Sequence, residues 1–531
     1  MIYFIPAWYQ QNQWCENEQS WRVRRMHTEF DDTVKQIQLF HRSGFYPYQI
    51  MLLSYAPNFR HFLHRQSVYR APYWSAFDAI QQVRRRKAVV LSFHNLKWPE
   101  SIEFIYSPFV VIAFLKGEKY AQIDFGEDGN PIRIDLYKEG KIYRRNIYDD
   151  RGFVSSAIIY EEEKPLYQEY LMENGIWKLR CYQKDGHVEI NPKYPAYLLR
   201  YKEEEKAERF SQTTYVSMGA VIYEVLVSYL RLTERGDIFC IAMHGQHTKL
   251  LANALRDRRI ILSFFSDRYS AAGHPEALDL VRRAGFIIAD SRENLKKIRW
   301  EAGELVKNIM VITPYDTRID LGISQQLSVQ KILVPVDDVG EEIFGEMICL
   351  LGKYLLRNKD AQVHLFTRKA DYDRKQRILE RMRNELRAGG FPEGWAGETT
   401  DEGISENNLE MAVNTSVKFY VEQCVDELAV SKCMREQRLL VDLRDIPELY
   451  LQITAISMGI PQIVRTWTEF VESGRNGVIL DDLRKLPDIL DYYLNGFKHW
   501  NEAVISSYEL SKEYSTDKLL EEWRGVIDSI G

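Results

Sequence analysis

The sequence predicts an α/β fold with two doubly wound halves and an antiparallel β-meander inserted into the first half. Through the first hundred residues apolar bursts alternate with amphipathic stretches, which is typical of parallel strands joined by helices. From residue 102 to 212 the pattern changes to short runs of period two. A second alternating unit begins near Lys331. A chain of 531 residues also exceeds what one hydrophobic core usually supports, so at least two domains are expected.

The first part of the N-terminal half is expected at residues 1–101. IYFIPAW and YQIMLLSYAP are apolar enough for buried strands, whereas DDTVKQIQLFHRSG and YWSAFDAIQQVRRRKA have helical patterns. The run AVVLSF, which follows the second helical stretch, is predicted to be a further strand.

The inserted meander is expected at residues 102–212. Its apolar and polar residues alternate, and the runs are separated by GE, EDGN, KEGK, DDRG, ENG and KDGH, which are compositions of hairpin turns. A long antiparallel sheet of this kind has a free edge, and partners can add a strand there.

Alternation resumes over residues 213–326, which complete the N-terminal half, and the C-terminal half is expected at 327–490. Residues 491–531 are predicted to form a helical tail that packs back on the N-terminal half, with Trp500 and Trp523 as packing anchors. Ligands of doubly wound sheets bind at the carboxyl ends of the strands, so a cleft between the halves is the expected site.

Composition excludes several classes of function. A net charge of −6 carries no signature of nucleic-acid binding. The six cysteines contain no CxxC pair and no interleaved histidines, so neither a metal site nor a disulfide framework is expected, and no cofactor is indicated. No basic leader precedes the apolar N-terminus, and no uncharged apolar run approaches the roughly 20 residues of a membrane span. A cytoplasmic protein is therefore predicted.

The segment PELYLQITAISMGIPQIVRTWTEFVESGRNGVIL resembles the donor-binding half of GT-B glycosyltransferases, in which a Gly-x-Pro and a later Asn-Gly recur. Together with FIPAWY, DDTVKQIQLF, ITPYDTRIDLGIS and DYYLNGFKHWN, it more closely resembles the family of the first of the three accessory Sec proteins. The resemblance implies a GT-B-like fold. It also implies partnership with the other accessory secretory proteins, the accessory SecA motor and the glycosylated serine-rich repeat adhesins that this system exports from Gram-positive cocci.

The resemblance also indicates where a donor site would lie. Retaining GT-B enzymes of this type place two acids eight positions apart, and alignment on Gly459 and Pro461 puts Ile446 and Thr454 at those positions. Isoleucine cannot accept a hydrogen bond, and threonine offers one hydroxyl where a carboxylate would hold a ribose. These four residues are interpreted as a degenerate donor site. Glu448, two residues from the first position, is the alternative acid, although a shift of two residues redirects a side chain.

The phosphate side of the predicted site is also altered. Related enzymes neutralise the diphosphate with an arginine and a lysine after the first strand of the C-terminal half, whereas VPVDDVGEEIFGE contains five acids and no base. Such a loop is expected to repel a diphosphate. Arg368, in HLFTRKADYD, is either an anion contact or a solvated residue at a strand end.

Further candidate residues have two interpretations each. His244 ends the predicted strand DIFCIAMHG and either lines the cleft or is structural, and Tyr315 and Arg318 either line the cleft or fix the linker between halves. The basic run at 84–87 is either a solvated helix end or a contact with an anionic membrane surface at the inner face of the cell membrane.

The aromatic residues near the N-terminus are either core residues or a platform for glycans. These residues are Trp8, Tyr9, Trp14 and Trp21.

Two functions are therefore compatible with the sequence. The first is a non-catalytic scaffold that binds the sister accessory proteins and also the substrate glycan. The second is an active glycosyltransferase that uses a sugar-nucleotide donor and substitute catalytic residues. Loss of both acids and both phosphate cations favours the scaffold, a pseudo-glycosyltransferase.

Overall fold

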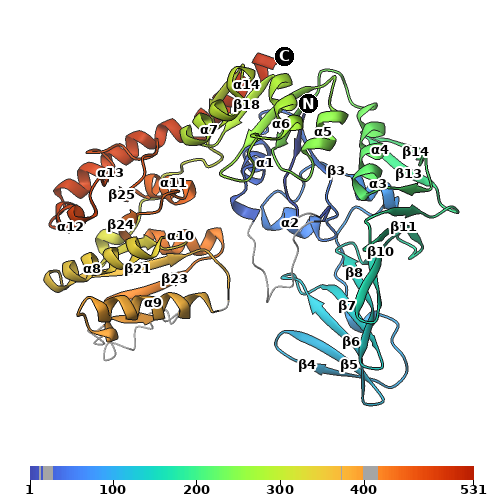
Figure 1. The fold of residues 1–531 in the computed structure, drawn as a ribbon, viewed down its shortest axis with the longest axis horizontal. Helices are drawn as coiled ribbons and strands as arrows, with labels where there is room; N and C mark the ends of the chain where they lie inside the picture. The colour runs from blue at the N-terminus through green and yellow to red at the C-terminus, as the bar shows by residue number, and fades with distance from the viewer. Residues whose placement is uncertain (11–12, 16–27, 372, 399–416, 531) are drawn as a thin grey trace.

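A computed structural model describes residues 1–10, 13–15, 28–371, 373–398 and 417–530 of the chain. Figure 1 shows two α/β halves side by side, with a long antiparallel sheet that projects from the N-terminal half.

The N-terminal half is built on a seven-stranded sheet in the order β19-β18-β17-β16-β1-β2-β3, in which every pairing is parallel. Its strands lack charged side chains at most positions, as expected for a sheet that helices cover on both faces. They are β1 (Ile2–Ile5), β2 (Tyr48–Leu52), β3 (Tyr73–Ser75), β16 (Ile238–Ala242), β17 (Arg259–Phe264), β18 (Phe286–Ala289) and β19 (Ile309–Val311).

In the chain, the helices of this half lie between the strands of its parallel sheet. The N-cap of the first is Asp31, whose side chain accepts from the Thr33 amide at 2.9 Å. The helices are α1 (Asp32–Ser43), α2 (Phe59–Arg65), α3 (Ala76–Gln81), α4 (Met218–Leu230), α5 (Thr248–Ala254), α6 (Pro275–Arg283) and α7 (Arg292–Ala302).

The inserted sheet has ten antiparallel strands in the order β15-β12-β11-β10-β9-β8-β7-β6-β5-β4. Its hairpins turn at the expected positions, where Gly140 (φ +74°) and Gly152 (φ +83°) adopt a conformation that favours glycine. The strands are β4 (Ile102–Tyr106), β5 (Val110–Leu115), β6 (Glu118–Phe125), β7 (Pro131–Lys138), β8 (Lys141–Asp149), β9 (Phe153–Glu161), β10 (Lys164–Leu171), β11 (Trp177–Tyr182), β12 (Val188–Ile190) and β15 (Thr214–Tyr215), with a separate hairpin β13 (Ala196–Tyr201) and β14 (Glu204–Arg209).

The sheet is joined to the N-terminal half by packing and by buried charge. Leu179 and Ile190 belong to the same core cluster as Tyr3 and Trp74 of the parallel sheet. The guanidinium of Arg60 on α2 lies against the carboxylates of Asp149 (3.1 Å) and Asp150 at the end of β8, and all three side chains are at most 4% exposed.

The prediction that AVVLSF forms a strand is wrong. Residues 88–92 form no strand, and Val90 is 91% exposed. The Val89 amide donates to the Asp150 carbonyl oxygen at 2.8 Å, so this segment runs along the junction with the inserted sheet and does not join the parallel sheet.

The C-terminal half contains the second seven-stranded parallel sheet, in the order β22-β23-β21-β20-β24-β25-β26. Its strands are β20 (Gln330–Pro335), β21 (Ala361–Thr367), β22 (Ala396–Glu398), β23 (Phe419–Gln423), β24 (Gln437–Asp442), β25 (Gln462–Val464) and β26 (Gly477–Ile479). Its helices are α8 (Glu341–Arg357), α9 (Arg374–Ala388), α10 (Glu427–Arg435), α11 (Leu449–Met458), α12 (Leu486–Leu494) and α13 (Lys498–Ser511).

The C-terminal tail is shared between the halves. Trp500 on α13 is buried in the C-terminal half, where its indole donates to the Arg438 carbonyl oxygen at 3.0 Å. The last helix, α14 (Thr516–Ile530), crosses to the N-terminal half, where Trp523 packs in a cluster with Phe4 and Phe40. Both predicted tryptophan anchors are thus buried, but only α14 packs on the N-terminal half.

Candidate functional site

A cavity of about 770 Å³ lies between the two halves. The N-terminal half lines it with the segments after β1, β17 and β18, and the C-terminal half with the segments before α11 and after β25. These segments follow the carboxyl ends of parallel strands, where doubly wound sheets bind ligands. The cavity therefore occupies the position that the sequence predicts for a site.

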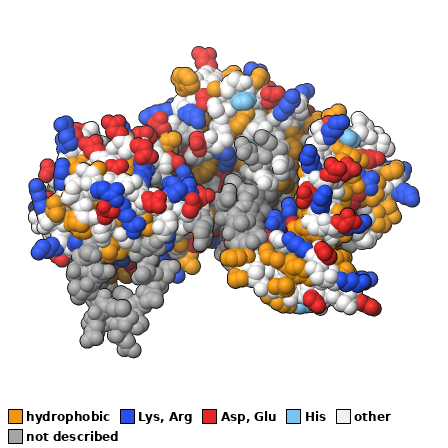
Figure 2. Space-filling view, turned by 60° about the horizontal axis from the view of Figure 1, so that its bottom comes forward, with side chains coloured by type: hydrophobic (Ala, Val, Ile, Leu, Met, Phe, Trp, Pro, Cys, Tyr) orange, Lys and Arg blue, Asp and Glu red, His pale blue; other side chains and the backbone are white. Residues whose placement is uncertain are grey.

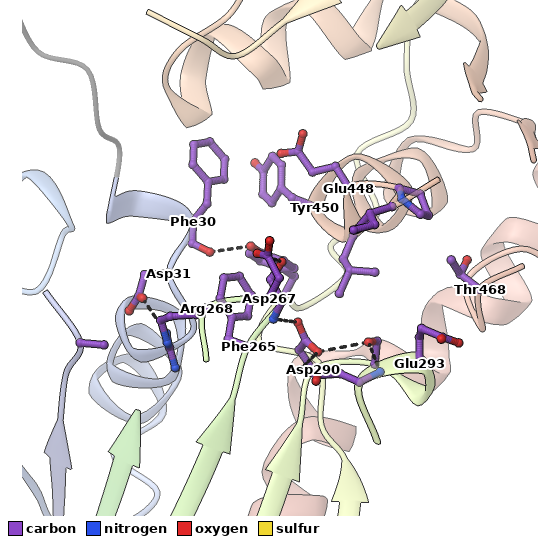
Figure 3. Close-up of a pocket in the computed structure, with 18 of the residues that line it drawn as sticks. Phe30, Asp31, Phe265, Asp267, Arg268, Asp290, Glu293, Glu448, Tyr450 and Thr468 are labelled. Carbon is purple, nitrogen blue, oxygen red and sulfur yellow. Dashed lines mark hydrogen bonds and ion pairs between the residues drawn. The ribbon is translucent and has the colours of Figure 1, made fainter. Parts of the chain in front are cut away.

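Phe30 lies between the two halves at this cavity. Its carbonyl oxygen accepts a hydrogen bond from the Tyr315 hydroxyl at 2.5 Å, and its ring meets the Tyr450 ring edge to face, with centroids 4.7 Å apart. The Arg368 guanidinium lies 3.4 Å from the centroid of the Phe30 ring. One residue of the N-terminal half is thus held by three residues of the linker and the C-terminal half. Figure 3 shows Phe30 beside Tyr450.

A buried acidic cluster forms the N-terminal wall. Arg268 binds Asp31 at 3.1 Å and Asp32 at 2.5 Å, and the Trp8 indole donates to Asp31 at 2.9 Å. Burial, followed by the charge of Asp32, raises the pKa of Asp31 to about 6. Two carboxylates share one guanidinium here, so the wall is not cationic.

Asp290 follows β18 and faces the same cavity (Figure 3). It accepts hydrogen bonds from the Ser266 amide at 2.6 Å, the Ser291 hydroxyl at 3.1 Å and the Asn294 side-chain amide at 3.0 Å. Burial raises the pKa of this carboxyl above its ordinary value. The hydrogen bonds fix its orientation, and its position gives the cavity a second acceptor group.

The arginines on the C-terminal side are engaged by carboxylates. Arg368 forms an ion pair with Glu448, and Arg444 binds Asp442 at 2.6 Å and Glu448 at 3.8 Å. Asp337, in the acidic loop after β20, accepts from the guanidinium of Arg374 at 2.8 Å. The charge of this loop is therefore partly neutralised within the protein, and Arg368, which lines the cavity, is already paired with a carboxylate.

Known proteins are similar to this chain in sequence and in fold. The family model of accessory Sec system protein 1 matches residues 1–529. The chain belongs to this family. The family member from Streptococcus gordonii is 30% identical over 529 residues, which are 98% of each chain.

Two solved structures that cover this chain completely are of similar assemblies. One is the Glycosylation Associate Protein (Gap123) complex from Streptococcus agalactiae, with a TM-score of 0.81, 28% identity and 100% of that chain covered. The other is that of accessory secretory proteins 1, 2 and 3 in Streptococcus pneumoniae, with a TM-score of 0.79, 29% identity and 99% of that chain covered. Both contain a chain that is closely similar in fold to this accessory Sec protein.

A third structure, that of a glycosyltransferase, shares the fold of the accessory Sec chain. The pneumococcal O-GlcNAc transferase GtfA, solved in complex with UDP and GlcNAc, has a TM-score of 0.69 over 100% of this chain and 98% of its own. Its sequence identity of 11% shows a common fold alone. The predicted GT-B-like fold class and the predicted family are both confirmed.

The structure separates the four predicted donor positions of this accessory Sec chain. Ile446 lines the cavity and is 71% exposed. Thr454 is buried on α11, and its hydroxyl donates to the Tyr450 carbonyl oxygen at 2.7 Å. Gly459 is the C-cap of the same helix at φ +69°, and Pro461 is buried beside β24, where its carbonyl oxygen accepts from the Leu440 amide at 3.0 Å. Among the four, only Ile446 is a lining residue of the described cavity.

The other predicted site residues of the accessory Sec chain are divided between cavity and surface. His244, Tyr315 and Arg368 line the cavity. Burial, followed by the charge of Arg268, lowers the pKa of His244, which keeps the ring neutral at pH 7. Arg318 is a surface residue that binds Asp316 at 3.0 Å and does not line the described cavity, which agrees with the linker interpretation.

The N-terminal aromatic residues are mostly core residues. Trp8 and Tyr9 are buried and contribute to the cavity wall, and the Tyr9 hydroxyl bonds His247 Nδ1 at 2.9 Å. Trp14 is half-buried and packs against the main N-terminal core. Trp21 lies outside the described residues. An exposed glycan platform at this end is therefore not supported by Trp8 or Tyr9.

Sequence reasoning missed several cavity residues of the accessory Sec chain. Asp290 follows the apolar run FIIA, and Asp31 precedes a predicted helix, so a search for acids at strand ends and helix starts finds them. Trp467, which is 40% exposed in the cavity, has no comparable signal in the sequence. Among the described residues, no helix is both long and apolar enough to cross a bilayer.

Proposed function

We propose that this chain is a non-catalytic GT-B-like component of the accessory Sec system, which acts as a scaffold for the other accessory secretory proteins and binds substrate glycan in its cavity. The observation that carries the proposal is the ion pairing at the C-terminal wall. Arg368 and Arg444 are held by Glu448 and Asp442, and an isoleucine stands at the first acid position. A sugar nucleotide would have to break these pairs before its diphosphate was neutralised.

The lining of the cavity fits a neutral glycan better than a nucleotide. Seven carboxylate side chains line it against four cationic ones, so an anionic ligand is disfavoured. Exposed aromatic surface such as Trp467 can stack on a sugar face, and oriented carboxylates such as Asp290 accept hydrogen bonds from sugar hydroxyls.

The scaffold role is supported by the assemblies in which the relatives were solved, because one is the Gap123 complex and the other contains accessory secretory proteins 1, 2 and 3. The surface that we propose for a sister protein is the β4 edge of the inserted sheet. Ile105 and Phe109 are 55% and 52% exposed there, and Figure 2 shows hydrophobic side chains gathered on this lobe, at the lower right. An edge strand offers backbone groups for strand addition.

In this proposal the protein acts in the cytoplasm with the accessory SecA motor and the glycosylated serine-rich repeat adhesin, at the inner face of the cell membrane. The basic run at 84–87 supports the membrane contact because its four side chains are exposed. Carboxylates lie near two of them, since Arg84 is 3.7 Å from Glu205 and Arg85 is 3.9 Å from Glu173. Their attraction to anionic lipid is correspondingly reduced.

Isothermal titration of UDP, UDP-GlcNAc and a GlcNAc-modified serine-rich peptide tests the ligand class. We expect heat only from the glycopeptide. Trp467→Ala should weaken that binding roughly threefold to tenfold, the range that one aromatic contact supplies. The matched control is Trp300→Ala, because Trp300 is 83% exposed on α7 and does not line the cavity. Micromolar UDP binding would contradict the proposal.

Size-exclusion chromatography with both sister proteins tests the docking edge. The Ile105→Lys, Phe109→Lys double variant should lose co-elution, because two charges would lie against the apolar edge. Val216→Lys is the control, since Val216 is 82% exposed and follows β15 at the opposite edge of the same sheet. Equal loss of co-elution in both variants would contradict the assignment of the β4 edge.

The active transferase is retained as the second candidate because Glu448, an acid, faces the cavity two residues from the first acid position, which Ile446 occupies. If Glu448 is a catalytic group, wild-type protein transfers sugar from UDP-GlcNAc to the glycopeptide and Glu448→Gln lowers that rate at least about a hundredfold. We expect no transfer from either protein.

A further inference from the structure

A cluster of metal-ligand side chains lies in the C-terminal half, away from the cavity. Glu422 is on β23, Cys424 directly follows this strand, and Cys433 is on α10. One ligand atom of each lies within 4.8 Å of the other two. Glu422 and Cys424 are two residues apart, so they share one side of the extended backbone, and the following helix returns Cys433 to that side.

The backbone around the cluster is fixed by hydrogen bonds. The Cys424 amide donates to the Thr367 carbonyl oxygen on the adjacent strand at 3.0 Å. The Gln437 side chain donates to the Cys433 carbonyl oxygen at 2.9 Å, and its nitrogen is 3.8 Å from the Cys433 sulfur. Both thiols therefore project from well-defined positions, which is the condition for a preformed site.

His364 on β21 supports the carboxylate. Its Nδ1 lies 2.8 Å from Glu422 Oε1, and its side chain is 1% exposed. A carboxylate accepts only, so Nδ1 carries the hydrogen and orients Glu422 as an outer partner of a metal ligand would.

We propose that Glu422, Cys424 and Cys433 bind a thiophilic divalent cation, with Zn²⁺ as the best match to two sulfur ligands and one carboxylate. Three protein ligands leave a fourth tetrahedral position for water. Glu422 and Cys433 are partly buried, and Cys424 is buried. Sequence spacing does not predict this site because the two cysteines are separated by eight residues and belong to different elements.

The bound ion would join β23 to α10, and α10 contacts the other half of the molecule. Glu427, at the start of this helix, binds Lys35 of α1 at 2.8 Å and accepts from the Tyr450 hydroxyl at 3.2 Å. A cation at the cluster would therefore stabilise the helix through which the C-terminal half contacts α1. This inference is independent of the proposed function because none of its ligands lines the cavity.

The test uses full-length protein that has been treated with a chelator under reducing conditions and then titrated with Co²⁺ or Zn²⁺ alone. We expect one equivalent of Zn²⁺ by elemental analysis, and with Co²⁺ a near-ultraviolet band from thiolate-to-metal charge transfer. Binding should also raise Tm, because the ion binds only the folded site.

Variants distinguish the cluster from the other thiols. Cys433→Ser and Cys424→Ser should each remove most of the Co²⁺ band, and His364→Ala should weaken Zn²⁺ affinity roughly tenfold through the loss of orientation at Glu422. Cys349→Ser is the control, because Cys349 lies on α8, and it should leave the Co²⁺ band and the Zn²⁺ affinity unchanged. Melting curves without metal identify any variant that fails to fold. Cys433→Ala, at a partly exposed position, is a second variant that removes the thiolate, and it should lose the Co²⁺ band in the same way. A full band in Cys433→Ser, or the absence of one-to-one binding in wild type, would overturn the proposal.

Discussion

At the scale of single residues, the cavity is lined by side chains that can bind a ligand, and the two positions predicted for donor-site acids differ in their surroundings. Ile446 is exposed in the cavity, and Thr454 is withdrawn into α11 with its hydroxyl bonded to the helix backbone. Glu448 retains a carboxylate, but that group is paired with Arg368. The carboxylate at this wall is therefore already paired within the protein.

This geometry predicts mild effects at both positions. Ile446→Ala should change the free energy of unfolding by no more than about 0.5 kcal/mol, because the side chain is mostly in solvent. Thr454→Ala should cost about 1 kcal/mol through the loss of its buried hydroxyl bond. Chemical denaturation measures both values, and adhesin export should remain within about twofold of wild type. A hundredfold loss of export in folded Thr454→Ala protein would show that this hydroxyl participates in function.

At the scale of elements, the spacing of hydrophobic residues was sufficient to predict the architecture. It was not sufficient to predict which residues line the cavity. Alternation of strands and helices predicted both parallel sheets, and glycine-bearing turns predicted the antiparallel one, because these are local properties. The AVVLSF strand was wrong because Val89 and Val90 lie exposed along a junction that local pattern cannot show. Phe30 meets Tyr315 and Tyr450, and such contacts between residues hundreds of positions apart have no signature in a single sequence.

The terminal helix α14 predicts a measurable pH dependence. Burial raises the pKa of Glu522 to about 7, whereas in the unfolded chain it is about 4.3. Between about pH 4.3 and 7 the folded state holds a proton that the unfolded state has released, so the contribution of this group to stability falls as pH rises.

Glu522→Gln removes that titration. The variant should be more stable than wild type at pH 8, by about 1 kcal/mol or less after solvent screening, and should show no such advantage near pH 4. Denaturation of both proteins across this range measures the difference. Glu521→Gln is the control, because Glu521 lies exposed on the same helix. An advantage of Glu522→Gln that is equal at pH 4 and pH 8 would contradict the buried-carboxyl explanation.

At the scale of the whole molecule, three bodies are joined by contacts of different chemistry. The chain crosses between halves twice, and the crossings lie together, since the Thr317 amide donates to the Tyr514 carbonyl oxygen at 2.9 Å. Phe30 adds an aromatic contact between the halves, whereas the inserted sheet is joined through buried charge at Arg60. The proposed scaffold would present a cavity and a sheet edge to different partners, which requires these bodies to hold a fixed relation.

From the buried charges at the junction between α2 and β8, we predict that Arg60 controls the attachment of the inserted sheet to the N-terminal half. Arg60 donates to Asp149 and Asp150, and Arg151 binds Asp149 and Asp78, both at 2.7 Å. Arg60→Ala would leave two buried carboxylates short of a partner, which typically costs about 3–5 kcal/mol.

Urea denaturation followed by tryptophan fluorescence and by circular dichroism should show this loss in Arg60→Ala, together with separate unfolding of the inserted sheet. Arg200→Ala is the control, because Arg200 pairs with Glu205 within the β13–β14 hairpin at a partly exposed site. That change should cost about 1 kcal/mol or less. If the cost of Arg60→Ala is equally small, the buried ion pairs do not hold the sheet, and the shared core around Leu179 and Trp74 must provide the attachment.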